Sequence, residues 1–202
     1  MTQVRFTKNE LRDQQIRYGQ LEKYLPTLQL KKALLQIEVN QVQAEIHQLV
    51  QERQEAYDIA AKSRGLLIEK HEIDPLDFTE VRYVQKSFEN IAGVEVPIFE
   101  AVHFAEIDYD FLTTPAWVDG MIGQLRSFVV AREKIHVMEE RKRALEHELR
   151  EVSIRVNLFE KILIPRCRAI IKKIQLFLGE QQLVAVSQAK VAKSKILARK
   201  EA

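Results

Sequence analysis

Apolar residues recur along the first part of the chain with the spacing of a coiled coil. They alternate in steps of four and three, interrupted at Lys32 and Arg53, and comprise Leu21, Leu25, Leu28, Leu35, Val39, Val42, Ile46, Leu49 and Ala56. A mean spacing of 3.5 residues keeps one stripe of a helix against a partner helix over many turns. We therefore expect a long helix from about residue 8 or 26 to about residue 72, with Pro26 marking a start, a kink or a short break.

The last part of the chain repeats this pattern. Its stripe consists of Leu145, Leu149, Val152, Val156, Phe159, Leu163, Ile170, Phe177 and Val184, and a second apolar edge consists of Ile154, Leu158, Ile162 and Ile171. We expect one helical arm over about residues 115–195, with Thr113 or Thr114 as its N-cap and Pro115 in its first turn. Pro165 lies inside this arm and predicts a bend past which the helix continues.

The segment between the two arms has a different pattern. Asp74 and Pro75 end the first arm, and we expect a short helix over about residues 75–90, capped by Asp77 or Thr79. After Gly93, apolar and polar residues alternate at Val94, Val96, Ile98, Val102 and Phe104, which predicts a small β-hairpin. Pro97 lacks a backbone donor and restricts this ribbon to the edge of a sheet.

These elements define a fold class and three segments. We predict an all-α protein, a long antiparallel two-helix coiled coil with a small middle region of short helix plus β-hairpin. The segments are an N-terminal coiled-coil arm (residues 1–72), the middle region (residues 73–114) and a C-terminal coiled-coil arm (residues 115–202). The N-terminal sequence lacks the apolar core of a signal peptide, and no apolar run is long enough to span a bilayer, so we expect no direct membrane insertion.

The net charge of +2 conceals an uneven distribution. Residues 69–110 carry 3 basic and 11 acidic side chains, whereas residues 161–200 carry ten basic side chains and only Glu180 as an acidic one. The basic arm is compatible with a solvated face, with a surface for a protein partner, or with a nucleic-acid interface. No aromatic platform or recognition motif accompanies the charge, which disfavours nucleic acid.

Signatures of catalysis are absent from the sequence. It contains no phosphate-binding GxxxxGK[ST] loop, no GxGxxG and no GxSxG, and Pro75 stands where HExxH needs its second histidine. The five histidines are scattered, so we expect packing or surface roles for His47, His71, His103, His136 and His147. Cys167 is the single cysteine, and we interpret it as a small residue on an apolar face. We expect no catalytic residue, metal or cofactor.

Three segments are more specific than the heptad pattern: RVNLFEKILIPR (residues 155–166), NIAGVEVP (residues 90–97) and TKNEL (residues 7–11). They resemble segments of the D subunits of V-type and archaeal A-type rotary ATPases. RVNLFEKILIPR (residues 155–166) is similar to that family's RVNALE…IIPR signature, and NIAGVEVP (residues 90–97) is similar to its NVMGVxVP segment. TKNEL (residues 7–11) resembles its N-terminal PTKxxL, although Phe6 replaces the proline. Residues 30–35 match only loosely the LLKxKRD stretch of the first arm, which indicates a divergent and bacterial branch.

The resemblance implies a non-catalytic rotor shaft, the central stalk between the A/B catalytic head and the ion-translocating membrane ring. It implies as partners the A, B and F subunits, together with the socket of the C subunit on the membrane ring, and a place on the cytoplasmic face of the membrane. We expect head-bearing contacts at Arg166, Arg168, Lys172 and Lys173, and a partner end at the hairpin residues Gly93, Val94, Val96 and Pro97. The alternative is a free-standing coiled-coil scaffold or tether, which the heptads alone would allow.

Overall fold

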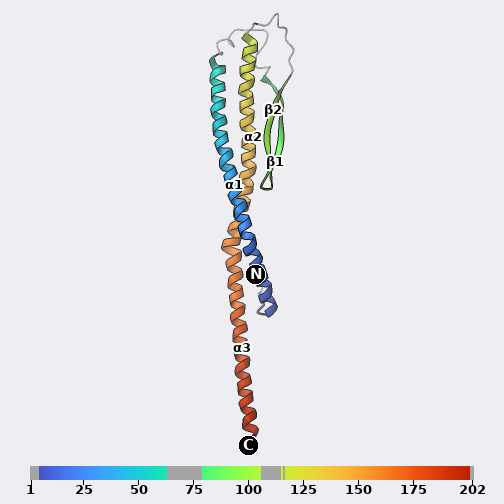
Figure 1. The fold of residues 1–202 in the computed structure, drawn as a ribbon, viewed down its shortest axis with the longest axis vertical. Coiled ribbons are helices and arrows are strands. Elements are labelled where there is room, and N and C mark those ends of the chain that lie inside the picture. The colour runs from blue at the N-terminus through green and yellow to red at the C-terminus, as the bar shows by residue number, and fades with distance from the viewer. Residues whose placement is uncertain (1–4, 63–78, 106–114, 116, 201–202) are drawn as a thin grey trace. The chain divides into compact units, whose positions relative to one another are not determined.

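The computed structural model describes residues 5–62, 79–105, 115 and 117–200. Its helices are α1 (Lys8–Lys62), α2 (Trp117–Leu158) and α3 (Ile164–Lys200) (Figure 1). A π-helical turn, η3 (Phe159–Leu163), lies between α2 and α3. Strands β1 (Val81–Ile91) and β2 (Val94–Phe104) form one antiparallel hairpin. The predicted fold class, an antiparallel helical coiled coil with a central β-hairpin, is confirmed.

The chain divides into two compact units, which we call the terminal unit (residues 1–30 and 152–202) and the hairpin unit (residues 31–151). The predicted division into three segments stays a prediction, because its boundaries near residues 72 and 114 lie outside the described residues. The predicted N-caps Thr113 and Thr114 and the predicted end of the first arm also lie outside them.

In the hairpin unit, α1 and α2 run in opposite directions. Lys31 pairs with Glu148 at 2.7 Å, while the ring of Tyr57, farther along α1, lies 5.9 Å from that of Phe128, nearer the start of α2. The buried side chains of α1 follow the predicted heptad stripe in steps of four, three and four, at Leu35, Val39, Val42 and Ile46. Buried side chains of α2 in this unit include Ile135, Met138 and Leu145.

In the terminal unit, the first part of α1 packs against α3. Thr7 caps α1, because its Oγ1 accepts from the Glu10 N–H at 3.3 Å. The helix therefore starts at residue 8 and continues through Pro26, which is neither its start nor a break. The rings of Phe6 and Phe177 lie 5.1 Å apart. Among the described residues of this unit, the buried side chains are Val152, Val156, Cys167 and Ile174.

The hairpin is longer than predicted and begins earlier in the chain. Residues 94–104 form only β2, and its partner is β1, so the predicted short helix over residues 75–90 is wrong from residue 81 onward. Residues 75–78 of that helix lie outside the described residues. The physical reason is that VRYVQKSFENI is rich in β-branched and aromatic residues, and pairing with β2 satisfies its backbone groups.

The hairpin turn explains the glycine in this segment. Ile91 pairs with Val94, which leaves a two-residue loop in which Ala92 and Gly93 have φ of 51° and 82°. Positive φ at both loop positions is typical of a type I′ turn, whose twist matches that of the paired strands. Glycine adopts a positive φ without steric cost. The Gly93 N–H donates to Asn90 Oδ1 at 2.9 Å, which closes the turn.

Two adjacent leucines of α1 allow a test of the heptad core. Leu35 is fully buried, whereas Leu34 is 47% exposed. We expect Leu35→Ala to lower the free energy of unfolding by about 2–5 kcal/mol through lost burial and a cavity. Leu34→Ala, the same change on the neighbouring residue, should cost less than about 1 kcal/mol. Urea denaturation followed by circular dichroism measures both, and equal losses would contradict this packing.

Candidate functional site: partner-binding surfaces

The four predicted head-bearing residues lie on α3 and all are exposed. Arg168 is engaged within the terminal unit, because its Nη2 donates to the Tyr18 hydroxyl at 2.8 Å and its guanidinium lies 5.6 Å from the Tyr18 ring centroid. This hydrogen bond raises the pKa of Arg168. Arg166, Lys172 and Lys173 form no ion pair with the residues that the structure describes. Their charges are therefore available to a partner.

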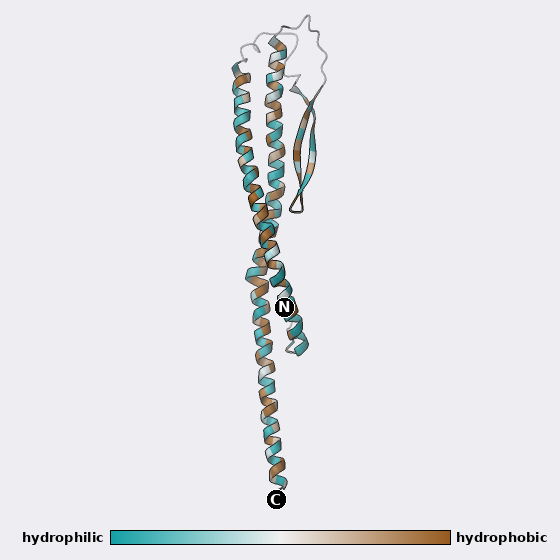
Figure 2. Cartoon of the chain, in the orientation of Figure 1, coloured by the Kyte–Doolittle hydropathy of each residue, from teal (hydrophilic) through white to brown (hydrophobic). Residues whose placement is uncertain are grey.

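Beyond Gly179, α3 is exposed over its whole described length. All side chains from Glu180 to Arg199 are exposed, and the large apolar ones are half-exposed or more, at Leu183, Val184, Val186, Val191, Ile196 and Leu197. At about 100° per residue these six positions surround the helix axis, with no gap wider than about 120°. Figure 2 shows apolar and polar residues interspersed along this stretch. It has no single stripe of the kind that a partner helix would cover.

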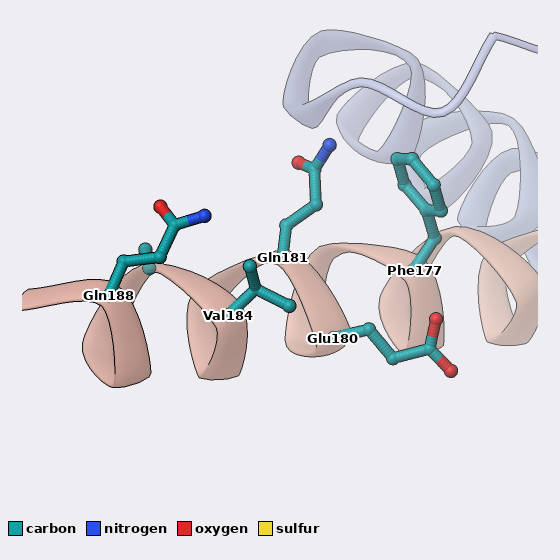
Figure 3. Close-up of a pocket in the computed structure, with 6 residues that line it drawn as sticks. Phe177, Glu180, Gln181, Val184 and Gln188 are labelled. Carbon is teal, nitrogen blue, oxygen red and sulfur yellow. The ribbon is translucent and has the colours of Figure 1, made fainter. Parts of the chain in front are cut away.

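A shallow hollow lies on α3 beside the aromatic pair. It is lined by Phe177, Glu180, Gln181, Val184, Ala185 and Gln188, all from one helix (Figure 3). Residues of a single helix cannot enclose a small ligand, since binding sites are concave and bury most of their ligand. We therefore interpret the hollow as surface relief next to Phe177, where α1 begins.

The four predicted hairpin residues divide into two groups. Val96 is fully buried and Pro97 is buried, so these two hold the hairpin within its unit and present no surface. Gly93 is exposed at the turn, and Val94 is half-buried. The exposed apolar side chains of the hairpin are instead Tyr83 and Phe88, at 52% and 70%. Sequence reasoning missed both, because it assigned their segment to a helix.

Charged side chains attach the hairpin to α2. Lys86 of β1 donates to Glu140 at 2.6 Å, and the guanidinium of Arg126 lies 4.8 Å from the Phe104 ring centroid. The hydrogen bond from Lys86 and the charges of Lys86 and His136 lower the pKa of Glu140 below its ordinary value of 4.5. At the turn, the Lys31 ammonium would lie 3.8 Å from a Cβ on Gly93, so the tip of the hairpin lies beside the Lys31–Glu148 pair.

A polar and aromatic cluster joins the two strands of the hairpin. The rings of Tyr83 and His103 are stacked with centroids 4.3 Å apart, and His103 Nε2 lies 3.1 Å from Gln85 Oε1. The Gln85 amide also donates to Glu100 at 2.6 Å. These residues become neighbours only through the strand register, in which Tyr83 faces His103, so a sequence read without that register could not find them.

Metal-ligand clusters and membrane-spanning helices do not occur in the part of the chain that the structure describes. Within those ranges, no three His, Cys, Asp or Glu side chains are grouped as metal ligands. No helix of the described residues is long and apolar enough to cross a membrane.

The described surfaces define a class: a helical hairpin protein with an exposed basic helix and a β-hairpin that carries exposed aromatic side chains. The sequence profile of the family of ATP synthase D subunits matches residues 10–194. The chain therefore belongs to the family of ATP synthase D subunits. It is 42% identical to the D subunit of the V-type ATP synthase of Chlamydia caviae over 99% of this chain and 97% of that protein. It is 39% identical to that of Chlamydia muridarum over 99% of each chain.

Glu140 gives a prediction about pH. A carboxyl group whose pKa is lowered on folding stabilises the fold above its unfolded pKa and loses this contribution as pH falls through the folded pKa. We expect Glu140→Gln to be less stable than wild type at pH 7 by under about 1 kcal/mol, because both partners are partly exposed. The difference should shrink as pH falls below the ordinary range of a glutamate carboxyl and should vanish below the lowered pKa of Glu140.

The matched control is Glu139→Gln, on the next residue, whose partner Arg143 is one turn away on the same helix at 3.5 Å. Thermal unfolding at pH 7 and pH 3 measures both variants. A Glu140→Gln deficit that is unchanged at pH 3, or one equalled by Glu139→Gln, would contradict the attachment.

Proposed function

We propose that this chain is the central rotor shaft of a V-type ATP synthase, a non-catalytic component that transmits rotation between an A/B catalytic head and an ion-translocating membrane ring. The observation that carries the proposal is the part of α3 beyond Gly179. A helix with apolar residues on all sides is expected to be buried. Here all of them are exposed in the isolated chain, so a partner that surrounds the helix suits this segment better than a single helix alongside it.

The charge of α3 supports the same assignment. Exposed Lys190, Lys193, Lys195 and Arg199 are interspersed among the apolar residues, and Arg166, Lys172 and Lys173 precede them. Exposed charges in water form weak contacts of about 1 kcal/mol or less each. Many weak contacts can be exchanged as a shaft turns, whereas a few buried ion pairs would each cost about 3–5 kcal/mol to break. We therefore assign the head bearing to α3, including Arg166, Arg168, Lys172 and Lys173.

The hairpin unit would supply a second set of partner contacts, which we call the partner end. Gly93 and Val94 lie at or beside the turn, and the exposed Tyr83 and Phe88 offer the aromatic area that protein interfaces favour. We assign to this end the F subunit, together with the socket of the C subunit on the membrane ring, and Val96 and Pro97 would support the hairpin from inside. Membrane attachment would run through these partners on the cytoplasmic face.

An antiparallel pair of helices also suits a rotor on symmetry grounds. Such a pair has no threefold axis, so at each angle it presents a different face to each of three catalytic interfaces. ATP chemistry would take place in the head, and this chain would determine which interface opens. The three segments of the chain, divided near residues 72 and 114, then correspond to two arms of the shaft and a partner-binding middle.

The bearing assignment is tested by charge reversal. We expect the combined variant Arg166→Glu, Arg168→Glu, Lys172→Glu and Lys173→Glu to abolish co-purification of the chain with A and B subunits and to lower coupled ATPase activity at least tenfold. A basic bearing implies an acidic surface on the head, and reversed charges facing that surface would cost several kcal/mol. The control exchanges Lys for Arg and Arg for Lys at the same positions, which keeps the charge and should keep assembly.

Unchanged assembly after charge reversal would refute the bearing. Light scattering on the purified chain tests the scaffold alternative. A tight homodimer that does not bind A, B and F subunits would favour the scaffold over the shaft.

A further inference from the structure

The buried residues of the terminal unit reveal one extra residue in the heptad pattern. Cys167 and Ile174 are seven positions apart and are 5% and 0% exposed. Val152, fully buried, lies on the same seam, but Cys167 follows it by fifteen positions, where two heptads span fourteen. One residue between them is therefore additional to the repeat.

The π-helical turn η3 lies within this interval. The Ile164 N–H donates to the carbonyl oxygen of Phe159, five residues earlier, in place of the usual four. A turn closed in this way contains one residue more than an α-helical turn, and the helix that follows keeps its phase. We propose that η3 absorbs the extra residue and sets the rotational phase of α3, so that the seam continues through Cys167 and Ile174.

The alternative phase would bury charge. Counting strict heptads from Val152 places Arg166 and Lys173 on the seam, one position before Cys167 and Ile174. Both cations are exposed in the structure. Burying an unpaired cation is far more costly than burying a small apolar side chain. The turn therefore keeps two basic residues on the surface of α3, whichever partner that surface serves.

Pro165 would determine where the extra residue is accommodated. It has no N–H for the carbonyl of Lys161, and in a regular helix its ring would clash with that carbonyl. Regular α-helical bonding is thus disfavoured at the point where η3 occurs. On this account the proline locates the turn, and the extra residue requires it.

The proposal is tested by removing the extra residue. We delete Lys161 from the full chain that carries Pro165→Ala. The deletion shortens the spacing from Val152 to Cys167 from fifteen positions to fourteen, and the alanine allows an uninterrupted α-helix. We expect a Tm within about 3 °C of Pro165→Ala alone. Cys167 is the chain's single cysteine, so a thiol reagent reports on it alone. Its rate of modification should stay within about threefold of the rate in Pro165→Ala, because Cys167 stays buried on the seam.

The matched control deletes Lys172, another exposed lysine, in the same Pro165→Ala background. This deletion shortens the spacing from Cys167 to Ile174 from seven positions to six and turns Ile174 off the seam by about 100°. We expect this variant to lose more than about 5 °C of Tm. The proposal is overturned if the Lys161 deletion fails to fold, if it exposes Cys167 to rapid modification, or if both deletions lower Tm equally.

Discussion

The seam of apolar side chains that repeats every seven residues is the constraint on which both compact units depend. In α1 it is the run from Leu35 to Ile46, and in the terminal unit it passes through Val152, Cys167 and Ile174. No polar or charged residue is fully buried among the residues that the structure describes. Because the seams are apolar, their stability comes from burial and packing. Charged side chains link elements beside the seam, as Lys31 and Glu148 do between α1 and α2 and as Lys86 and Glu140 do between β1 and α2.

The two long helices could be predicted from the sequence, because the apolar seam sets their heptad spacing directly. Heptad spacing located both long helices, and the helix start at Lys8 agreed with one of the two limits considered. It could not assign residues 81–91, because a short apolar segment satisfies helix and strand patterns alike and only pairing with β2 decides between them. It placed Cys167 on an apolar face but not on the seam itself, because a strict repeat places Arg166 there. Pro165 signals an irregularity in the helix but does not reveal that the turn contains an extra residue.

The candidate surfaces were predicted less completely than the fold. The four basic residues on α3 are exposed as expected, but their neighbours differ: Arg168 is held by Tyr18, a contact between segments 150 positions apart in sequence. In the hairpin, Val96 and Pro97 were chosen for their sequence motif, and motifs mark structural positions as readily as contact positions. Exposure, which separates the two, depends on which face of β2 meets the helices.

The apolar seam covers only the first part of α3, so the two parts of this helix differ. Up to Phe177 the helix has α1 against it, and its buried residues Cys167 and Ile174 lie on one side, whereas Leu176 is exposed. From Glu180 onward apolar residues occupy every side, and no part of α1 that the structure describes packs against them. A sequence under no constraint there would be expected to become uniformly polar, because exposed apolar area favours aggregation. The exposure of Leu183, Val186 and Ile196 on different sides of the helix therefore supports the surrounding partner that we propose, and the interspersed cations would keep the helix soluble until that partner binds.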